Sequence, residues 1–162
     1  MSFDLIKNII TEKFGETAII SSHEEAIQPF VVIQTDLLLD VCSELQSNPQ
    51  TYFDHLSCIT GVDNGVEKDS MEVIYHLYSI TKNVHFIIKV ILDRNQPRVP
   101  SLTSIWGTAN WHERETYDLF GIHFENHPDL RRILLPANWE GHPLRKDYTT
   151  QEYFHGVKVD YE

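Results

Sequence analysis

Cysteine is scarce in this sequence, basic residues are few, and no long apolar run occurs. The two cysteines, Cys42 and Cys58, lack a CxxC spacing and lie in apolar surroundings, which disfavours a disulfide framework or a thiolate metal site. Lys and Arg number 13 against 24 Asp and Glu, and the net charge of −11 disfavours nucleic acid and anionic lipid as partners. A membrane span needs roughly 18 consecutive apolar residues, and the sequence has no such run.

The features of a targeting signal are missing as well. Residues 1–16 contain no apolar signal core, acidic residues occur early, and the first arginine is Arg94. Neither a secretory signal nor a transit peptide is therefore expected. We expect a protein of a bacterial-type cytoplasm that reaches a membrane only through other proteins, without direct insertion.

Charge is unevenly distributed along the chain. Residues 1–96 contain 6 basic and 14 acidic residues, residues 97–148 contain 6 and 7, and residues 149–162 contain 1 and 3. Five of the six basic residues in the middle block are arginines, whose planar guanidinium suits buried or interfacial ion pairs better than an ammonium does. The middle block is therefore expected to hold paired charges.

Hydrophobic periodicity in the first half of the chain predicts helices and short strands. Apolar residues at helical spacing predict one helix over residues 2–14 and another from an Asp36 cap to about Gln46. Runs rich in β-branched residues predict strands at 17–21, 30–35 and 56–62.

The clearest strand pattern is a hairpin, with strands at 71–80 and 84–92 joined by a turn at 81–83. Both faces of these strands carry apolar residues, so we expect the sheet to be covered at least in part on both sides.

A second helix-rich stretch is expected after Pro97 and Pro100, which end the sheet. A short helical piece is predicted at about 101–108. Asn110 is then expected to cap a helix that ends at Gly121, with Glu113 in the capping-box position. Beyond it the chain shows little periodicity, and such a long irregular segment is expected to lie on its own domain or on a partner. The predicted fold class is α+β, with a mixed, mainly antiparallel sheet, flanking helices and an extended irregular C-terminal segment.

The helix over residues 111–120 carries charges on all its faces, mixed with large aromatic side chains. Some of these charges must point at protein, and a buried charge requires a partner. We therefore predict that Glu113, Glu115 and Asp118 pair with basic residues downstream. The candidate partners are Arg131, Arg132, Arg145 and Lys146.

The same region carries a recognisable series of motifs. These are ERE at 113–115, DLFG at 118–121, HPDLRRIL at 127–134 and WEGHPLRKDY at 139–148. Together they resemble the signature of the 30-kilodalton (C) subunit of respiratory complex I. The close match covers roughly residues 97–148. It divides the chain into a domain at 1–148, made of a sheet-and-helix part (1–96) and a signature and docking segment (97–148), and a short C-terminal tail at 149–162.

The resemblance implies a non-catalytic structural and assembly subunit in the peripheral arm of a proton-translocating NADH:quinone oxidoreductase. Such a complex passes electrons from NADH through FMN and iron–sulfur clusters to quinone, and the chain itself is expected to hold no cofactor and no metal. The expected partners are the large quinone-site subunit and the small cluster-bearing subunit, at the cytoplasmic side of the bacterial inner membrane. The structural or interface residues implied are Trp111, Glu113, Arg114, Glu115, Asp118, His127, Asp129, Arg131, Arg132, Trp139, Arg145 and Lys146.

Three alternatives remain open from the sequence. The same kind of chain serves in related complexes fed by ferredoxin or reduced deazaflavin. His112-Glu113 begins an HExxH-like metal motif, although position 116 is Thr where the second His is required. The carboxylates of the helix are also possible acid/base groups of a small metal-dependent hydrolase, but neighbouring arginines favour the ionised forms that suit salt bridges.

Overall fold

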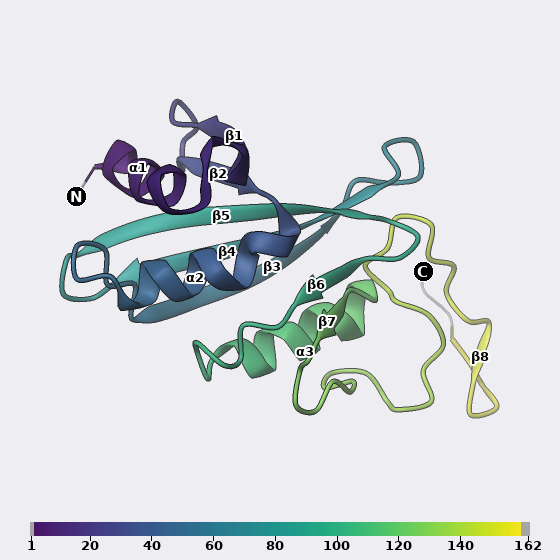
Figure 1. Cartoon of the computed structure of the whole chain (residues 1–162). Helices are drawn as coiled ribbons and strands as arrows, with labels where there is room; N and C mark the ends of the chain where they lie inside the picture. Colours follow the sequence, from purple (N-terminus) through teal and green to yellow (C-terminus); the bar gives the residue numbers. More distant parts are fainter. Residues whose placement is uncertain (1, 160–162) are drawn as a thin grey trace.

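The computed structural model describes residues 2–159, which form a five-stranded sheet with three α-helices (Figure 1). In spatial order the strands are β1 (Ile19–His23), β2 (Phe30–Ile33), β5 (Val84–Asp93), β4 (Ser70–Ser79) and β3 (His55–Asp63). Neighbouring strands are antiparallel except for β2 and β5, which are parallel. The predicted α+β class with a mainly antiparallel sheet is confirmed.

All three helices pack on one face of the sheet. Helices α1 (Phe3–Phe14) and α2 (Leu38–Ser47) contribute Ile6, Ile10, Val41 and Leu45 to a core that includes alternate residues of β4. Helix α3 (Ala109–Phe120) lies beside β3, where a Cβ on Gly61 would come within 2.8 Å of Phe120. In the sheet Gly61 lies opposite Val73 of β4, and Val73 is buried in the core under α1 and α2. Helix α3 therefore packs on the same face of the sheet as α1 and α2.

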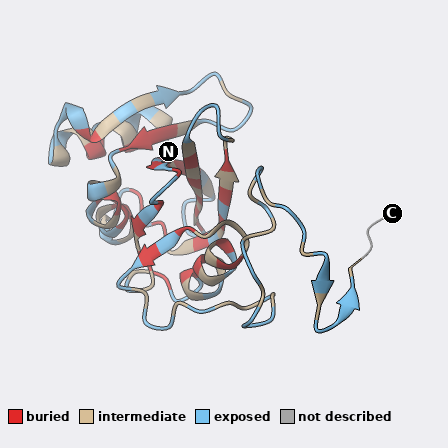
Figure 2. Ribbon diagram, turned by 90° about the vertical axis from the view of Figure 1, so that its right-hand side faces the viewer, coloured by how far each residue is buried: buried red, intermediate tan, exposed pale blue. Residues whose placement is uncertain are grey.

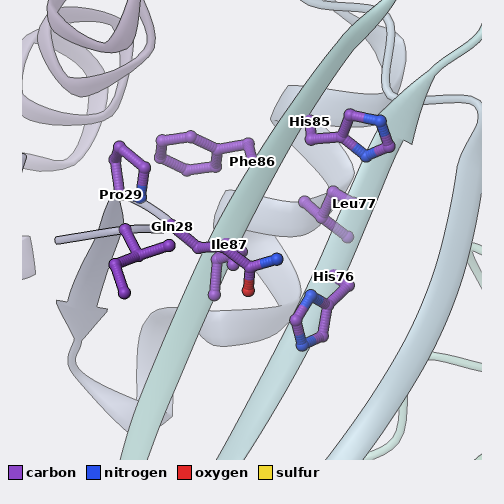
Figure 3. Close-up of a pocket in the computed structure, with 8 residues that line it drawn as sticks. Gln28, Pro29, His76, Leu77, His85, Phe86 and Ile87 are labelled. Carbon is purple, nitrogen blue, oxygen red and sulfur yellow. The ribbon is translucent and has the colours of Figure 1, made fainter.

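The opposite face of the sheet is open over most of its area. Ile91 is 49% exposed there, and Ile74 and Tyr78 are only partly buried. The loop before β2 covers a small part, leaving a cavity of about 350 Å³ between Gln28 and Pro29 on one side and His76 and His85 on the other (Figure 3). The expected cover on the second face is therefore limited to this loop, and within residues 2–159 no helix contributes to it.

The helix and strand boundaries predicted from neighbouring residues agree with the structure in most of the first half of the chain. Helix α1 begins after a Ser2 cap and ends at Gly15, and the hairpin of β4 and β5 lies within a residue of its predicted bounds. The 3₁₀ turn η1 (Glu16–Ala18) delays β1 to Ile19. Asp36 was expected to cap α2, which is wrong, because it lies inside the 3₁₀ turn η2 (Thr35–Leu37) and α2 begins at Leu38.

The segment before α3 departs from the prediction. Residues 101–108 form turns and not a helix, because tertiary hydrogen bonds fix them: Glu113 accepts from the amide of Leu102, and Trp106 donates to the carbonyl of Phe53. The predicted capping box is absent as well. Helix α3 already begins at Ala109, and the carboxylate of Glu113 turns towards residues 101–102 and away from the helix start.

The part of the chain beyond α3 is mostly irregular, as predicted, but contains three short strands, the first of which is β7 (His123–Glu125). β7 pairs in parallel with β6 (Arg98–Pro100), which precedes α3. β8 (Tyr153–Phe154) and β9 (Val157–Lys158) form a small hairpin that projects from the body of the molecule and is largely exposed (Figure 2). No helix among residues 2–159 is long and apolar enough to cross a bilayer.

Candidate docking site around helix α3

Asp118 is the buried anchor of the segment that follows α3. Its side chain is fully buried, and Oδ1 accepts a hydrogen bond from Nη1 of Arg132 at 2.8 Å. Oδ2 accepts from the amides of the next three residues, 133–135, at 3.0, 2.8 and 2.9 Å. Burial alone raises the pKa of a carboxyl group, but these donors outweigh burial and hold the pKa of Asp118 below its ordinary value. Asp118 is therefore a charged centre around which an irregular loop is wound.

The C-terminal end of α3 supplies three more acceptors to the same segment. The carbonyl of Asp118 accepts from Arg132 and from Nδ1 of His142, at 3.1 and 2.9 Å. The carbonyl of Leu119 accepts from the amide of Leu144 at 3.0 Å, and that of Phe120 from Nε of Arg145 at 2.7 Å. Helix ends leave such carbonyls without partners inside the helix. Here a distant stretch of the chain binds each of them, so the helix end and residues 132–145 form one unit.

Gly121 makes this close approach possible. It ends α3 in a left-handed conformation with a φ of +75°, which favours glycine. A Cβ at this position would lie 2.6 Å from the ring of His142 and 3.0 Å from Arg145. Any side chain at 121 would therefore push residues 142–145 away from the helix.

Arg114 and Arg132 hold the middle of the segment from two sides. Arg114 donates to the carbonyls of Arg131 and Arg132 at 3.2 and 3.3 Å. Arg132 also donates to the carbonyl of Gly141 at 2.8 Å, so its guanidinium joins α3 to the 139–142 turn. A guanidinium is planar and carries five N–H donors, so each of these arginines can bind two backbone oxygens at once.

Glu113 behaves differently from Asp118, and its predicted pairing with an arginine is wrong. The side chain is fully buried and accepts from the hydroxyl of Ser101 and the amide of Leu102, both at 2.7 Å. No arginine or lysine pairs with it among residues 2–159, and Nε2 of His127 lies 4.0 Å from its Oε2. Burial raises the pKa of Glu113 to about 7, against the effect of the two hydrogen bonds. The arginines gather at the other end of α3, out of its reach.

The remaining predicted pairs also differ from the structure. Glu115 is exposed and makes no ion pair among residues 2–159. Arg131 pairs with Asp129 at 2.9 Å on the surface, where both side chains are more than half exposed. Arg145 binds a carbonyl and not a carboxylate, and Lys146 contributes its backbone amide to Asp63 at 2.8 Å. Of the three proposed acids, only Asp118 pairs with a predicted arginine.

A second buried ion cluster was missed from the sequence. Arg94, at the end of β5, makes a two-pronged contact with Asp63, at the end of β3, with distances of 2.8 and 3.0 Å. The same guanidinium donates to Asp147 at 2.5 Å. The Arg94 bonds hold the pKa of Asp63 well below its usual range. The cluster ties residues 146–147 to the sheet. The one available signal was that Arg94 is the first arginine of the chain and directly follows a strand.

Two tryptophans and one histidine remain among the predicted interface residues. Trp111 is 70% exposed, whereas the ring of Trp139 packs on Phe154 of the small hairpin at 5.2 Å. His127 accepts from the amide of Asp129 through Nδ1 and binds the carbonyl of Asn110 through Nε2. Whether these residues contact a partner stays a prediction.

The polar groups of the site are largely engaged with one another. Both buried carboxylates of α3 are occupied by hydrogen bonds, and Thr116, where an HExxH motif needs its second His, donates to the carbonyl of His112 at 2.9 Å. Among residues 2–159 no three His, Cys, Asp or Glu side chains lie close enough together to hold a metal ion. The segment beyond α3 is therefore an irregular surface that is hydrogen-bonded to the end of the helix.

Known proteins share this arrangement of sequence and fold. The family model described as "Respiratory-chain NADH dehydrogenase, 30 Kd subunit" matches residues 31–154. The chain belongs to this family. The C subunit of the NADH-quinone oxidoreductase of Chlorobium phaeobacteroides is 41% identical over 155 residues, which cover 95% of this chain and 93% of that protein. The corresponding C subunit of a Roseiflexus species is 45% identical over 130 residues, 80% of this chain and 75% of that protein. The resemblance seen in the sequence is thereby confirmed.

Three further matches add to this comparison. The C/D subunit of the NADH-quinone oxidoreductase of Proteus mirabilis is 40% identical over 152 residues, 90% of this chain but 25% of that longer protein. Among solved structures, a trypsin-resistant fragment of Nqo5 matches with 28% identity and a TM-score of 0.61, covering 78% of this chain and 97% of the fragment. A chain of an archaeal membrane-bound sulfane sulfur reductase shares the fold, with 23% identity and a TM-score of 0.72, over 90% of this chain and 84% of that one.

Proposed function

We propose that this chain is a non-catalytic structural and assembly subunit of a proton-translocating NADH:quinone oxidoreductase. The observation that carries the proposal is the anchoring of residues 131–145 to α3 through Asp118 and the three carbonyls at the helix end. An irregular segment held by so many partly buried polar contacts keeps one shape, and a fixed shape is what a docking surface requires. Family membership supplies the complex in which such a surface is used.

The side chains that this segment presents to solvent suit an interface. Leu134 is 60% exposed and Leu144 is 50% exposed, and the exposed Trp111 lies on α3. Arg131 is also on the surface. Aromatic residues and arginine are the usual anchors of protein interfaces, and Trp111 and Arg131 supply both here. We therefore assign residues 129–146 and the exposed side of α3 to contacts with neighbouring subunits.

The large quinone-site subunit is the neighbour that we propose first. In Proteus mirabilis a region similar to this chain is part of a protein named as the C/D subunit, so that the two parts are joined in one polypeptide. Joining two chains raises their effective concentration for each other. The two parts benefit from this only where they lie close enough in the complex to bind each other. We place the small cluster-bearing subunit as a second neighbour, and the chain at the periphery of the complex on the cytoplasmic side of the membrane.

In this proposal the electrons do not pass through the chain. FMN, the iron–sulfur clusters and quinone are held by other subunits, and this chain positions the subunit that receives quinone. Elemental analysis and a visible spectrum of the purified chain test this part: no stoichiometric metal and no flavin or cluster absorbance is the expected result.

Affinity purification tests the proposal as a whole. A tagged chain expressed in its own cells should recover the large redox subunits from gently solubilised membranes. The identity of the co-purifying input module then decides between NADH and another electron donor such as ferredoxin or deazaflavin. A chain that elutes alone and monomeric from such membranes contradicts the proposal.

A further inference from the structure

Strand β3 forms a long outer edge of the sheet. It has nine residues, pairs with β4 on one side only, and lies at the end of the strand order. Within residues 2–159 no backbone atom of residues 57–62 is hydrogen-bonded outside this ladder. Natural proteins commonly protect such edges with lysine, proline or a covering segment. The stretch from Cys58 to Val62 contains neither lysine nor proline, and the register shift of β3 lies before it, between Leu56 and Cys58. The other edge, β1, is shorter, with five residues.

A groove runs along this edge, between β3 and α3. It encloses a cavity of about 260 Å³ lined by residues 58–61, by Leu119 and Phe120 of α3, and by Leu144 of the docking segment. Leu144 is half exposed at its mouth. The groove therefore places an apolar floor directly beside unpaired strand backbone. That combination suits an extended peptide. Its main chain can hydrogen-bond to the free edge of the strand, and every second side chain can enter the groove.

The charge of the groove indicates what kind of peptide can bind there. Glu115 lines the groove, is exposed, and has no ion pair among residues 2–159. A second copy of this chain is a poor occupant, because two chains of net charge −11 repel each other and the residues at the groove offer no basic group to Glu115. A complementary occupant carries a basic side chain next to an apolar one.

We propose that the outer edge of β3 receives an extended segment of a neighbouring subunit, which adds a sixth strand to the sheet. Its apolar side chain enters the groove at Leu119 and Leu144, and its lysine or arginine pairs with Glu115. The inference rests on the proposed function, because it needs a neighbouring subunit. It adds the surface, the mode of binding and the chemistry of the bound segment.

Matched substitutions in cells that lack the native copy test the proposal. Thr60→Lys places a charge on the exposed edge of β3, and Ser22→Lys places the same charge on the exposed edge of β1. Glu115→Lys reverses the charge in the groove, and Glu12→Lys makes the same reversal on the exposed side of α1. Thr60→Lys and Glu115→Lys should lower the amount of chain recovered with the solubilised complex by roughly tenfold or more. The two controls should stay within about twofold of the wild type, and all four isolated chains should melt as the wild type does.

The native thiols provide a direct footprint of the same edge. Cys58 lies on β3 at the groove and is partly exposed, whereas Cys42 is fully buried and burial raises the pKa of its thiol far above the usual value. N-ethylmaleimide should therefore label Cys58 in the isolated chain and leave it unlabelled in the assembled complex.

The outcomes separate this inference from the proposed function. Recovery of Thr60→Lys and Glu115→Lys at wild-type levels, or equal labelling of Cys58 in both states, overturns the added strand while the wild type still co-purifies with redox subunits. Failure of the wild type itself to co-purify overturns the proposed function. A wild-type dimer in sedimentation experiments that Thr60→Lys dissociates identifies a second copy as the occupant and overturns the proposal.

Discussion

The two ends of α3 bury carboxylates in opposite electrostatic states. Near the C-terminal end, Asp118 meets a guanidinium and three amides, and its pKa is lowered. Towards the N-terminal end, Glu113 meets one hydroxyl and one amide, and its pKa is raised to about 7. Both side chains are fully buried. The difference shows that a buried acid stays ionised where its charged and amide donors outweigh the effect of burial, and becomes protonated more easily where they do not.

This comparison assigns different roles to the two ends. The C-terminal end fixes the docking segment through a permanent charge. The N-terminal end joins the 101–103 turn to the helix through a group that changes protonation near neutral pH. Substitutions at each end can therefore separate the two roles.

The largest effect is expected at Asp118. Asp118→Ala removes the acceptor of four hydrogen bonds and leaves the largely buried guanidinium of Arg132 without its counter-charge. Breaking a buried pair in this way costs about 3–5 kcal/mol of unfolding free energy. Denaturant titration of the purified chain measures the loss. Asp129→Ala, which breaks the exposed pair with Arg131, is the matched control and should change stability by roughly 0.5 kcal/mol or less.

The effect of Glu113 should depend on pH. Its pKa rises from 4.5 to about 7 on folding, so between these values the folded state binds more protons than the unfolded state. The contribution of Glu113 to stability is therefore complete below pH 4.5 and is lost as pH rises towards 7, by about 3 kcal/mol. Glu113→Gln should lack this component, so the difference between the wild-type and variant stability curves should change by about 3 kcal/mol between pH 4.5 and pH 7. Equal pH dependence in the two proteins, or a change of the same size in the exposed control Glu12→Gln, contradicts the assignment.

A smaller loss is expected from Gly121→Ala. The added Cβ requires a residue other than glycine at a φ of +75° and contacts His142 at 2.6 Å. Strain of this kind costs about 1–3 kcal/mol, and it should be accompanied by faster hydrogen exchange in residues 141–145. Gly107→Ala is the control, since nothing lies within 4 Å of a Cβ built there. Identical melting of the two variants argues against the close packing described.

The smallest effect is expected at Glu115. The sequence predicted that this residue is buried in an ion pair, but the structure shows it exposed. Glu115→Ala should therefore shift the free energy of unfolding by no more than roughly 0.5 kcal/mol in the isolated chain. A loss of several kcal/mol in a chemical denaturation experiment supports the original prediction and contradicts the structure.

The comparison also shows how far sequence reasoning reaches. Helix α1 and the β4–β5 hairpin follow from periodicity over neighbouring residues, and both were predicted. That Asp118 pairs with a basic residue downstream was predicted from charges on every face of one helix with arginines just beyond it, and the structure identifies Arg132 as the partner. Each of these inferences needs only the order of residues and the period of the element that they form.

Partner choice at longer range could not be predicted in the same way. Glu113 binds Ser101 and Leu102, which precede it, because α3 folds back on its own entry loop. Asp63 and Arg94 meet because β3 and β5 flank β4 and end at the same side of the sheet. Both contacts depend on the direction in which an element crosses the fold, and no local pattern encodes that direction. The same limit explains the failed helix at 101–108, where tertiary hydrogen bonds replace helical ones.

The docking role of the segment beyond α3 is tested most directly by amine-reactive crosslinking of the intact complex. Lys146 is exposed in the docking segment, and Lys82 is exposed in the turn between β4 and β5. Mass spectrometry of the crosslinked complex should find Lys146 joined to another subunit of the oxidoreductase, and more often than Lys82. Crosslinks from Lys146 that reach only residues of its own chain, in a complex that contains the chain, contradict the account.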